Sequence, residues 1–432
     1  MNDHHLYRTV RSIGRSLGRM TLAGLLLGMA SLPAGAQQKF NDWGWPEPDE
    51  KISAKSVTWL KEKGWWPIGV AFQGPWSGQN TLNVVMNREG LLAKRGIESK
   101  FQTFGAGPDI NEAVASGRFH VGHGGNFPFT SLLDKKVPVK VLAVLTPNIK
   151  HAVVVPLNSP AKALKDFKGS NPPAVIGIVT GSSAEFFFTQ AAEVHGLAIG
   201  KDVVLKNMPI ADQLTMPQGV AAVVPWEPAA SQVMVGLKTG REIDSIFPYN
   251  FYEGNFYVRQ EMIDNVPDVV QAIMDAHVEA DLWVRRHPEK AVEYLLEEPM
   301  IRGFGRELLA QQTLFYNIYY KPTAEYPFVE FWGQENERIA NWLHQRNRIQ
   351  TPLKAKDYAQ AFDVRFIDKT YGKLGWAIPK TPPFLPAGWK GKIGKVPYPD
   401  YDNVNTLKAP QPWPAKGDLV KPWSFAGKTH QP

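Results

Sequence analysis

The sequence predicts an α/β fold in two lobes, with mixed, mostly parallel β-sheets flanked by helices. Short apolar, β-branched runs alternate with amphipathic stretches as far as about Pro267, which is typical of parallel sheets covered by helices. Several runs end in glycine loops that lead directly into helix-start residues, which is the strand–loop–helix unit. The chain has 432 residues, and this length favours two lobes over one core.

Residues 1–36 predict a cleavable signal peptide. Four arginines precede an apolar run over 20–32, and Ala34-Gly-Ala36 has the small residues of a cleavage site. The run is shorter than the roughly 20 residues that span a bilayer. With no cysteine for a lipid anchor, we expect cleavage near Ala36 and a soluble protein in the periplasm.

Composition excludes some classes of protein. The absence of cysteine rules out disulfides, so the core alone must provide stability. The formal charge is +7, and the predicted leader accounts for about three of these charges. Acidic residues separate the remaining basic ones, so no nucleic-acid-binding patch is expected. A mildly basic surface is compatible with an anionic solute.

The first half of the mature chain predicts an irregular lead-in and then alternating elements. Residues 37–63 are polar, contain tryptophan and are interrupted by Pro46-Glu-Pro48. The expected strands are 67–73, 97–104, 120–122, 137–145 and 151–156. The expected helices are 81–92, 108–116, one that begins at Asn126, and 161–168. Thr81 and Asn126 are residue types that cap helices.

The stretch 174–188 is the most informative part of the chain. An apolar run breaks at Thr180-Gly181 into helix-start residues. A helix start has unpaired N–H groups and a partial positive charge, so Thr180, Ser182 and Ser183 could bind a carboxylate, sulfonate, nitrate or phosphate. Alternatively, Ser182 and Glu185 form a capping box that satisfies the same groups. Both interpretations remain open.

The second half continues the pattern and then becomes helical. Strands are expected over 203–208 and 221–224, with helices over 211–218 and from Glu227-Pro228. After Pro267, apolar residues recur at helical spacing over 269–282, 291–296, 308–315 and 339–343. Beyond Trp376 the chain is rich in proline, lysine and tryptophan, which predicts an extended segment.

Catalytic motifs are missing. The sequence has no cysteine nucleophile, Gly-x-Ser-x-Gly elbow, phosphate-binding Gly-Lys-Ser/Thr loop or His-Glu-x-x-His helix. We therefore expect no enzyme activity, no cofactor and no metal. His120 and His123 would lie on opposite faces of a strand, and His123, at the carboxyl end of that strand, is a pocket candidate.

Ligands of open α/β sheets bind beyond the carboxyl ends of the strands. The residues that follow predicted strands are Gln73, Trp76, His123, Asn126, Thr180, Ser182, Ser183, Trp226 and Glu227. Each has a structural alternative, because the tryptophans could be core residues and Asn126 could simply cap its helix. Their shared position favours a binding site.

These residues, in this order, resemble the periplasmic solute-binding proteins of nitrate/sulfonate/taurine-type ABC importers. The resemblance runs from about Val70 to Gly375 and depends on an ordered set of short segments. They are Val70-Ala-Phe-Gln73, Phe104-Gly-Ala-Gly107, Ala115-Ser-Gly117, Val121-Gly-His-Gly-Gly-Asn126, Gly181-Ser-Ser183, Trp226-Glu-Pro228 and Tyr371-Gly-Lys-Leu-Gly375. The resemblance implies a class II periplasmic-binding-protein fold with a cleft between lobes. Lobe 1 would comprise 64–150 and 251–375, lobe 2 would comprise 151–250, and 376–432 would be an extension.

The resemblance also implies roles. Gln73, Asn126 and Phe127 match cleft positions, Ser182 and Ser183 match the anion-facing helix start, and Trp226 and Glu227 match a wall of the cleft. The ligand would pass to a membrane permease, and the protein would be a monomer. The chain departs from the family at His123, at the acidic Glu185 and in an aromatic set, Phe72, Phe127 and Phe129.

The leading hypothesis is a binding protein for a small anion, with aliphatic sulfonate ahead of an aromatic carboxylate or sulfonate, and nitrate third. A neutral heteroaromatic solute, such as a pyrimidine vitamin precursor, is the alternative within the same class. An exported enzyme on the same fold is the alternative from another class.

Overall fold

The computed structural model describes residues 39–318, 323–376 and 393–398, and the backbone alone at 423–425 and 428–430. The predicted signal peptide therefore lies outside the described residues, as does most of the predicted extension. No helix in the described part of the chain has the length and apolar character needed to cross a membrane.

Fifteen strands and fifteen α-helices are found in the described residues. The strands are β1 (Lys39–Phe40), β2 (Pro46–Glu47), β3 (Ile68–Gln73), β4 (Ser99–Phe104), β5 (Val121–Gly125), β6 (Val139–Leu145), β7 (Ala152–Pro156), β8 (Ala174–Ile178), β9 (Val203–Asn207), β10 (Ala222–Val223), β11 (Gly240–Ser245), β12 (Gly254–Arg259), β13 (Glu325–Tyr326), β14 (Trp423–Phe425) and β15 (Lys428–His430). The helices are α1 (Ala54–Glu62), α2 (Gln79–Arg88), α3 (Leu91–Lys94), α4 (Gly107–Ala115), α5 (Asn126–Asp134), α6 (Ser183–Val194), α7 (Ile210–Gln213), α8 (Ala229–Ser231), α9 (Gln260–Asn265), α10 (Pro267–Arg286), α11 (Pro288–Glu297), α12 (Arg306–Thr313), α13 (Glu330–Gln345), α14 (Ala355–Ala361) and α15 (Arg365–Lys373). Short 3-10 turns, η1 (Leu164–Phe167) and η3 (Arg302–Phe304), and π turns, η2 (Gln232–Gly236) and η4 (Leu314–Ile318), complete the set.

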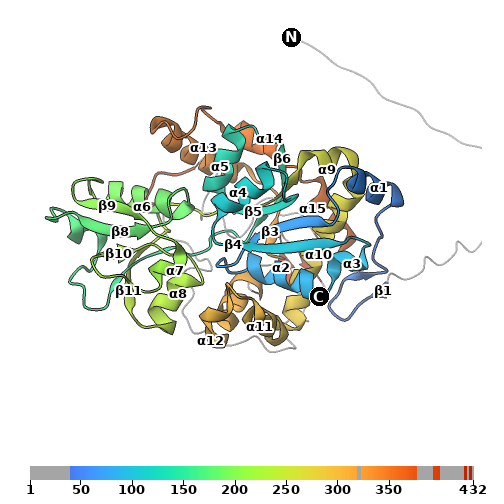
Figure 1. Cartoon of the computed structure of the whole chain (residues 1–432), viewed down its shortest axis with the longest axis horizontal. Coiled ribbons are helices and arrows are strands. Elements are labelled where there is room, and N and C mark those ends of the chain that lie inside the picture. The colour runs from blue at the N-terminus through green and yellow to red at the C-terminus, as the bar shows by residue number, and fades with distance from the viewer. Residues whose placement is uncertain (1–38, 319–322, 377–392, 399–422, 426–427, 431–432) are drawn as a thin grey trace, which may run out of the picture. The chain divides into compact units, whose positions relative to one another are not determined.

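Two mixed sheets organise the fold. The larger has the strand order β13-β6-β12-β5-β3-β4, and the smaller has the order β11-β7-β10-β8-β9. Figure 1 shows β8 to β11 in green and β3 to β5 in blue and cyan. The chain leaves the larger sheet between β6 and β7 and returns between β11 and β12. These two crossovers connect the two lobes.

Antiparallel pairing is more extensive than the sequence predicts. The strands β3 with β4 and β5, and β8 with β9 and β10, are parallel as expected. The strands β11, β12 and β13, which the sequence did not predict, all pair antiparallel to their neighbours. The strand β11 reads Gly-Arg-Glu-Ile-Asp-Ser and β13 has two residues, so neither carries the apolar run of a buried strand.

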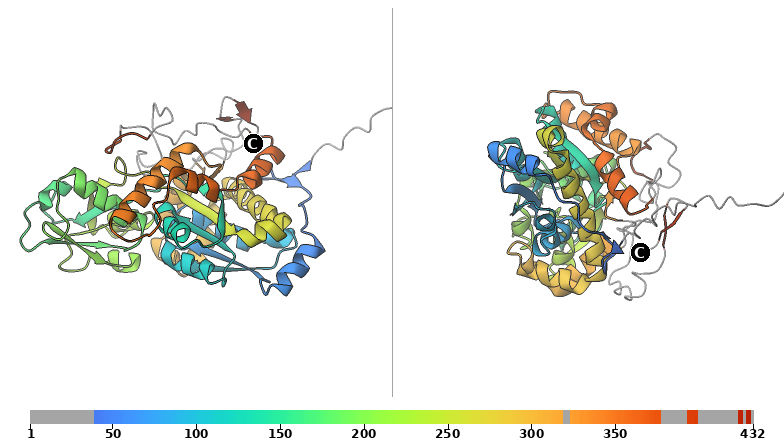
Figure 2. Two further views of the ribbon diagram at one scale, coloured as in Figure 1. Left: turned by 90° about the horizontal axis from the view of Figure 1, so that it is seen from above. Right: turned by 90° about the vertical axis from the view of Figure 1, so that its right-hand side faces the viewer.

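Helices after β12 cover the larger sheet. The helix α10 is buried along almost its whole length and packs against α2, α3 and α15. Figure 2 shows α13, α14 and α15, in orange, along one side of this sheet, where α14 and α15 contact β6 and α13 contacts α5. The helical flank predicted after Pro267 is therefore present.

The lead-in predicted to be irregular over 37–63 contains the helix α1. The Ser53 hydroxyl accepts a hydrogen bond from the Ser56 N–H at 3.1 Å and so caps the helix start. Such a cap stabilises a helix by about 1 kcal/mol. The amide N–H of Ser53 donates to Asp268 of α10 at 2.8 Å. This hydrogen bond connects the start of α1 to α10, which covers the larger sheet.

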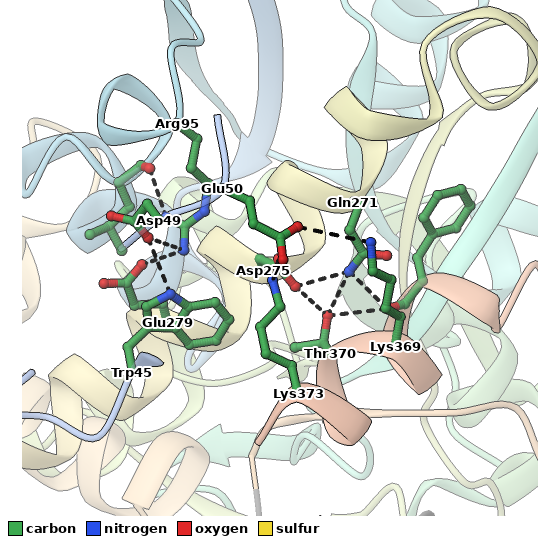
Figure 3. Close-up of polar contacts among 12 residues, drawn as sticks. Trp45, Asp49, Glu50, Arg95, Gln271, Asp275, Glu279, Lys369, Thr370 and Lys373 are labelled. Atoms are coloured by element: carbon green, nitrogen blue, oxygen red, sulfur yellow. Dashed lines mark hydrogen bonds and ion pairs between the residues drawn. The ribbon is translucent and has the colours of Figure 1, made fainter. Parts of the chain in front are cut away.

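A buried arginine fixes the segment before α1. The Arg95 side chain is 1% exposed and pairs with Asp49 at 2.8 Å and with Glu279 of α10 at 2.7 Å. Figure 3 shows this arrangement, in which the Trp45 indole N–H also donates to Asp49 at 3.1 Å. Trp45 is 2% exposed and packs in the hydrophobic core.

Candidate ligand-binding site

A narrow pocket lies where the ends of strands from both sheets meet. It is lined by Gln73, Trp76, Gly107, Pro108, Gly125, Pro128, Ile149, His151, Ser182, Ser183, Trp226 and Tyr252. Its empty space is about 330 Å³ including space open to solvent, but the centre of a water molecule can occupy only about 20 Å³ of it. A ligand of more than a few atoms therefore requires the walls to move apart.

Three helices begin at this pocket. Gly107 and Pro108 are the first residues of α4, Gly125 is the N-cap of α5, and Ser182 is the N-cap of α6. Each helix start has a partial positive charge and N–H groups without intrahelical partners. Among the described residues, no lysine, arginine, aspartate or glutamate lines the pocket. The local field therefore favours an anion without providing a cationic side chain for it.

The start of α6 is only partly capped. Glu185 Oε2 accepts a hydrogen bond from the Gly181 N–H at 2.7 Å, whereas the Ser182 hydroxyl donates to the Val179 carbonyl at 2.7 Å and caps nothing. The predicted capping box is therefore replaced by one carboxylate contact at Gly181. In the first turn of α6 the Glu185 N–H donates to the Ser182 carbonyl at 3.1 Å, so the N–H groups that precede it, from Ser182 to Ala184, are the ones left for a ligand.

Two buried donors beside the pocket lack acceptors. Trp76 Nε1 and Asn126 Nδ2 have no hydrogen-bond partner among the described residues, and both side chains are at least 98% buried. Asn126 Oδ1 accepts from the Phe127 N–H at 3.1 Å and from the Ser183 hydroxyl at 3.4 Å. A buried donor without a partner is costly by about 1–3 kcal/mol. A ligand with acceptor oxygens would remove this cost.

Aromatic rings form the other walls. The Trp76 and Tyr252 rings meet edge to face at 5.7 Å, and the His151 ring lies 5.2 Å from Tyr252 and 5.9 Å from Trp226. Burial lowers the pKa of His151 to about 4, so this side chain is neutral at neutral pH. Burial raises the pKa of Tyr252 well above its usual value, so its hydroxyl keeps its proton.

Five of the predicted site residues line the pocket: Gln73, Trp76, Ser182, Ser183 and Trp226. The Trp226 indole N–H donates to the Pro75 carbonyl, which links the smaller sheet to the loop after β3. Asn126 adjoins the pocket through Ser183. His151 and Tyr252 were not predicted. Both lie at the crossovers between the sheets, and that position is the signal that could have identified them.

His123 lies away from the pocket, contrary to the sequence prediction. Its Nδ1 is 3.1 Å from the Ala71 carbonyl oxygen, its Nε2 is 3.3 Å from His277 Nε2, and its ring stacks on Phe256 at 4.9 Å. Burial and the neighbouring His277 hold the pKa of His123 well below its usual value. The side chain points to the face of β5 that α10 covers, so it is a neutral core residue.

Phe127, Thr180 and Glu227 also lie outside the pocket lining. Phe127 packs in an aromatic cluster with Phe186 at 6.1 Å and Trp342 at 5.8 Å. Thr180 is exposed, and its N–H donates to an asparagine side chain. The Glu227 carboxylate accepts from the hydroxyl of Ser231 at 2.7 Å, and burial raises its pKa. Ring packing holds Phe127, and the hydrogen bond to Ser231 holds the Glu227 carboxylate, outside the pocket.

Comparison with known proteins identifies a matching family and several solved structures with a similar fold. A model of the NMT1-like family matches residues 69–295. The alkanesulfonate-binding protein SsuA from Xanthomonas axonopodis pv. citri, bound to MOPS, is similar in structure with a TM-score of 0.57 and 17% identity, over 68% of this chain and 97% of that one. The periplasmic nitrate-binding protein NrtA from Synechocystis PCC 6803 gives 0.57 and 15%, over 71% and 88%. The desulfurization enzyme DSZB gives 0.53 and 15%, over 71% and 99%.

The identities to these solved structures are too low to transfer a ligand or an activity, but the likeness establishes a two-lobed fold. The family match covers more than half of the chain and includes all the predicted site residues. The chain belongs to the NMT1-like family and has the fold of the periplasmic binding proteins.

Proposed function

We propose that this chain is the periplasmic solute-binding component of an ABC importer and that it captures an organic anion for delivery to a membrane permease. The family match and the sulfonate- and nitrate-binding neighbours support the transport role. A monomer suits the role, with residues 64–150 and 251–375 as lobe 1 and 151–250 as lobe 2. Residues 1–36 would direct export.

The observation that carries the proposal is the convergence of three helix starts on one pocket with two unpartnered donors. The starts of α4, α5 and α6 all favour negative charge, and Trp76 Nε1 and Asn126 Nδ2 can both donate hydrogen bonds. A sulfonate or carboxylate presents acceptor oxygens to such donors and has no hydrogen-bond donor in its charged group. Hydrogen bonds to a charged group contribute about 1.5–3 kcal/mol each.

The aromatic walls favour a ligand with a flat apolar body. Stacked or edge-to-face ring pairs contribute about 0.5–1.5 kcal/mol beyond area burial. Trp76, His151, Trp226 and Tyr252 would surround such a ring. The site therefore favours an aromatic sulfonate or carboxylate over an aliphatic sulfonate, and nitrate fits least because it has no apolar part to place there.

Binding without chemistry is favoured because the pocket lining has no activated nucleophile. The Ser182 hydroxyl is bonded to a carbonyl, and the Ser183 hydroxyl points to Asn126 Oδ1 at 3.4 Å. Nucleophilic catalysis requires a base that is hydrogen-bonded to the nucleophile. Among the described residues, neither serine hydroxyl is hydrogen-bonded to a histidine or a carboxylate.

Calorimetry tests the proposal with matched charged and neutral probes. We expect benzenesulfonate and benzoate to bind, and methanesulfonate, taurine and nitrate to bind more weakly. Benzenesulfonamide and benzamide, which keep the ring and lose the charge, should bind at least tenfold more weakly than their anions. Ser183→Leu should abolish binding by filling the pocket, whereas Thr180→Leu, at an exposed position, should not. Binding of a neutral pyrimidine in preference to every anion would refute the proposal and establish the heteroaromatic alternative.

A further inference from the structure

An acid stands beside the proposed anion site, and an arginine from a distant part of the chain pairs with it. Glu185 lies in the first turn of α6 and is 9% exposed. Arg348 Nη1 is 2.6 Å from Glu185 Oε1. The second oxygen of the carboxylate is occupied by the Gly181 N–H. Each oxygen of the Glu185 carboxylate therefore has a partner within the protein.

Arg348 is itself held in place. It follows α13, and its backbone N–H donates to the Leu343 carbonyl at 2.9 Å. Its guanidinium lies 5.7 Å from the centre of the Phe127 ring and 5.8 Å from that of Trp342. These rings belong to the cluster that buries Phe186 of α6. The same packing that joins α13 to α6 therefore aims Arg348 at Glu185.

We propose that Arg348 is a positioning residue that sets the charge at the start of α6. This inference rests on the proposed function. Paired with Arg348, Glu185 contributes no net charge, and the helix start stays attractive to an anion. Without Arg348, a full negative charge would stand within one helical turn of Ser183 and would repel the ligand. Glu185 is not among the described residues that line the pocket.

The expected size of the effect follows from Coulomb's law. A unit charge acting over roughly 8 Å, at effective dielectric constants of roughly 20–40, changes binding by roughly fivefold to thirtyfold. Salt at about 0.15 M reduces this effect, because the pair is partly exposed. The change should apply to charged ligands and leave a neutral ligand of the same shape unaffected.

Four proteins test the inference: wild type, Arg348→Gln, Glu185→Gln and the double variant. Calorimetry with benzenesulfonate should show about tenfold weaker binding for Arg348→Gln, equal or tighter binding for Glu185→Gln, and near wild-type binding for the double variant. Benzenesulfonamide, although weaker, should bind all four alike. Arg346→Gln is the matched control. It removes the same charge two residues away, where the guanidinium stacks on Trp342 and has no carboxylate partner among the ion pairs of the described residues.

The outcomes separate two failures. If Arg348→Gln weakens both probes equally and the double variant stays weak, Arg348 acts by holding the lobes together and the inference is wrong. If Arg346→Gln has the same effect as Arg348→Gln, general surface charge explains the result and the inference is also wrong. If the wild-type protein does not prefer benzenesulfonate to benzenesulfonamide, the proposed function falls, and the inference falls with it.

Discussion

Gly125 is the point at which one added methyl group should block closure of the pocket. A Cβ atom at this position would lie 2.9 Å from the Ser183 hydroxyl oxygen and 2.9 Å from Cε2 of Tyr252. The φ angle of Gly125 is −71°, which any residue can adopt. The cost of Gly125→Ala is therefore a matter of packing and not of backbone strain.

The free-energy cost of Gly125→Ala follows from these two contacts. Contacts near 2.9 Å force neighbours to move, and inserting a methyl group into a packed site costs about 1–3 kcal/mol. The contact with Ser183 joins the start of α5 to the start of α6, so we expect it to be lost if the two lobes move apart. Its share of the cost should therefore reduce affinity by roughly fivefold to a hundredfold. The part of the cost that comes from the contact with Tyr252 should lower the stability of the protein both with and without ligand.

Calorimetry with benzenesulfonate and thermal unfolding without ligand separate the two shares. The double variant Gly125→Ala, Ser183→Ala removes the hydroxyl that the methyl group would strike, so it should bind as Ser183→Ala alone does. Gly372→Ala is the control, because a Cβ there has no neighbour within 4 Å. Wild-type affinity in Gly125→Ala, or no relief in the double variant, would show that Ser183 and Gly125 do not approach each other in the bound state.

Three further predictions concern a donor, a histidine and the lead-in. Trp76→Phe keeps a ring but removes an N–H that has no acceptor. The affinity for benzenesulfonate, measured by calorimetry, should fall tenfold or more, while the free energy of unfolding changes little. Unchanged affinity would contradict a role for Nε1. Burial lowers the pKa of His120 to about 4, so the free energy of unfolding should fall as pH drops from about 6.5 to about 4. Chemical denaturation should show a fall larger by up to roughly 3 kcal/mol in wild type than in His120→Gln. The same dependence of unfolding free energy on pH in both proteins would contradict this. Arg95→Met leaves the buried Glu279 carboxylate without its cation and should cost about 3–5 kcal/mol of unfolding free energy. Adding Glu279→Gln should recover part of that loss, and no recovery would count against the pair.

The parallel units were predictable because each carries its own local signal. The run of β8 and the break at Gly181 predict strand, turn and helix without any tertiary information, and the structure has β8 and then α6 there. The rule that ligands bind beyond strand ends also located Gln73, Trp76 and Trp226 at the pocket. Local pattern and global fold agree at these points.

The remaining site residues depend on contacts that the local sequence does not encode. His123 and Gln73 both lie on neighbouring strands of one sheet, yet His123 faces α10 and Gln73 lines the pocket. Side-chain parity along a strand decides this, and a shift of one residue reverses the face. His151 and Tyr252 approach each other only because the chain crosses twice between the sheets.

The acid at position 185 shows most clearly why charge near a site cannot be judged from its neighbours in sequence. Taken alone, Glu185 argues against an anion at the start of α6. In the structure its partner is 163 residues away, at the end of α13, and a cluster of aromatic rings fixes the geometry between them. A guanidinium cancels a carboxylate only where packing holds the two together, so the electrostatics of the helix start depend on hydrophobic contacts between the lobes. Substitutions in that aromatic cluster should therefore change ligand selectivity between anions and neutral isosteres as well as stability.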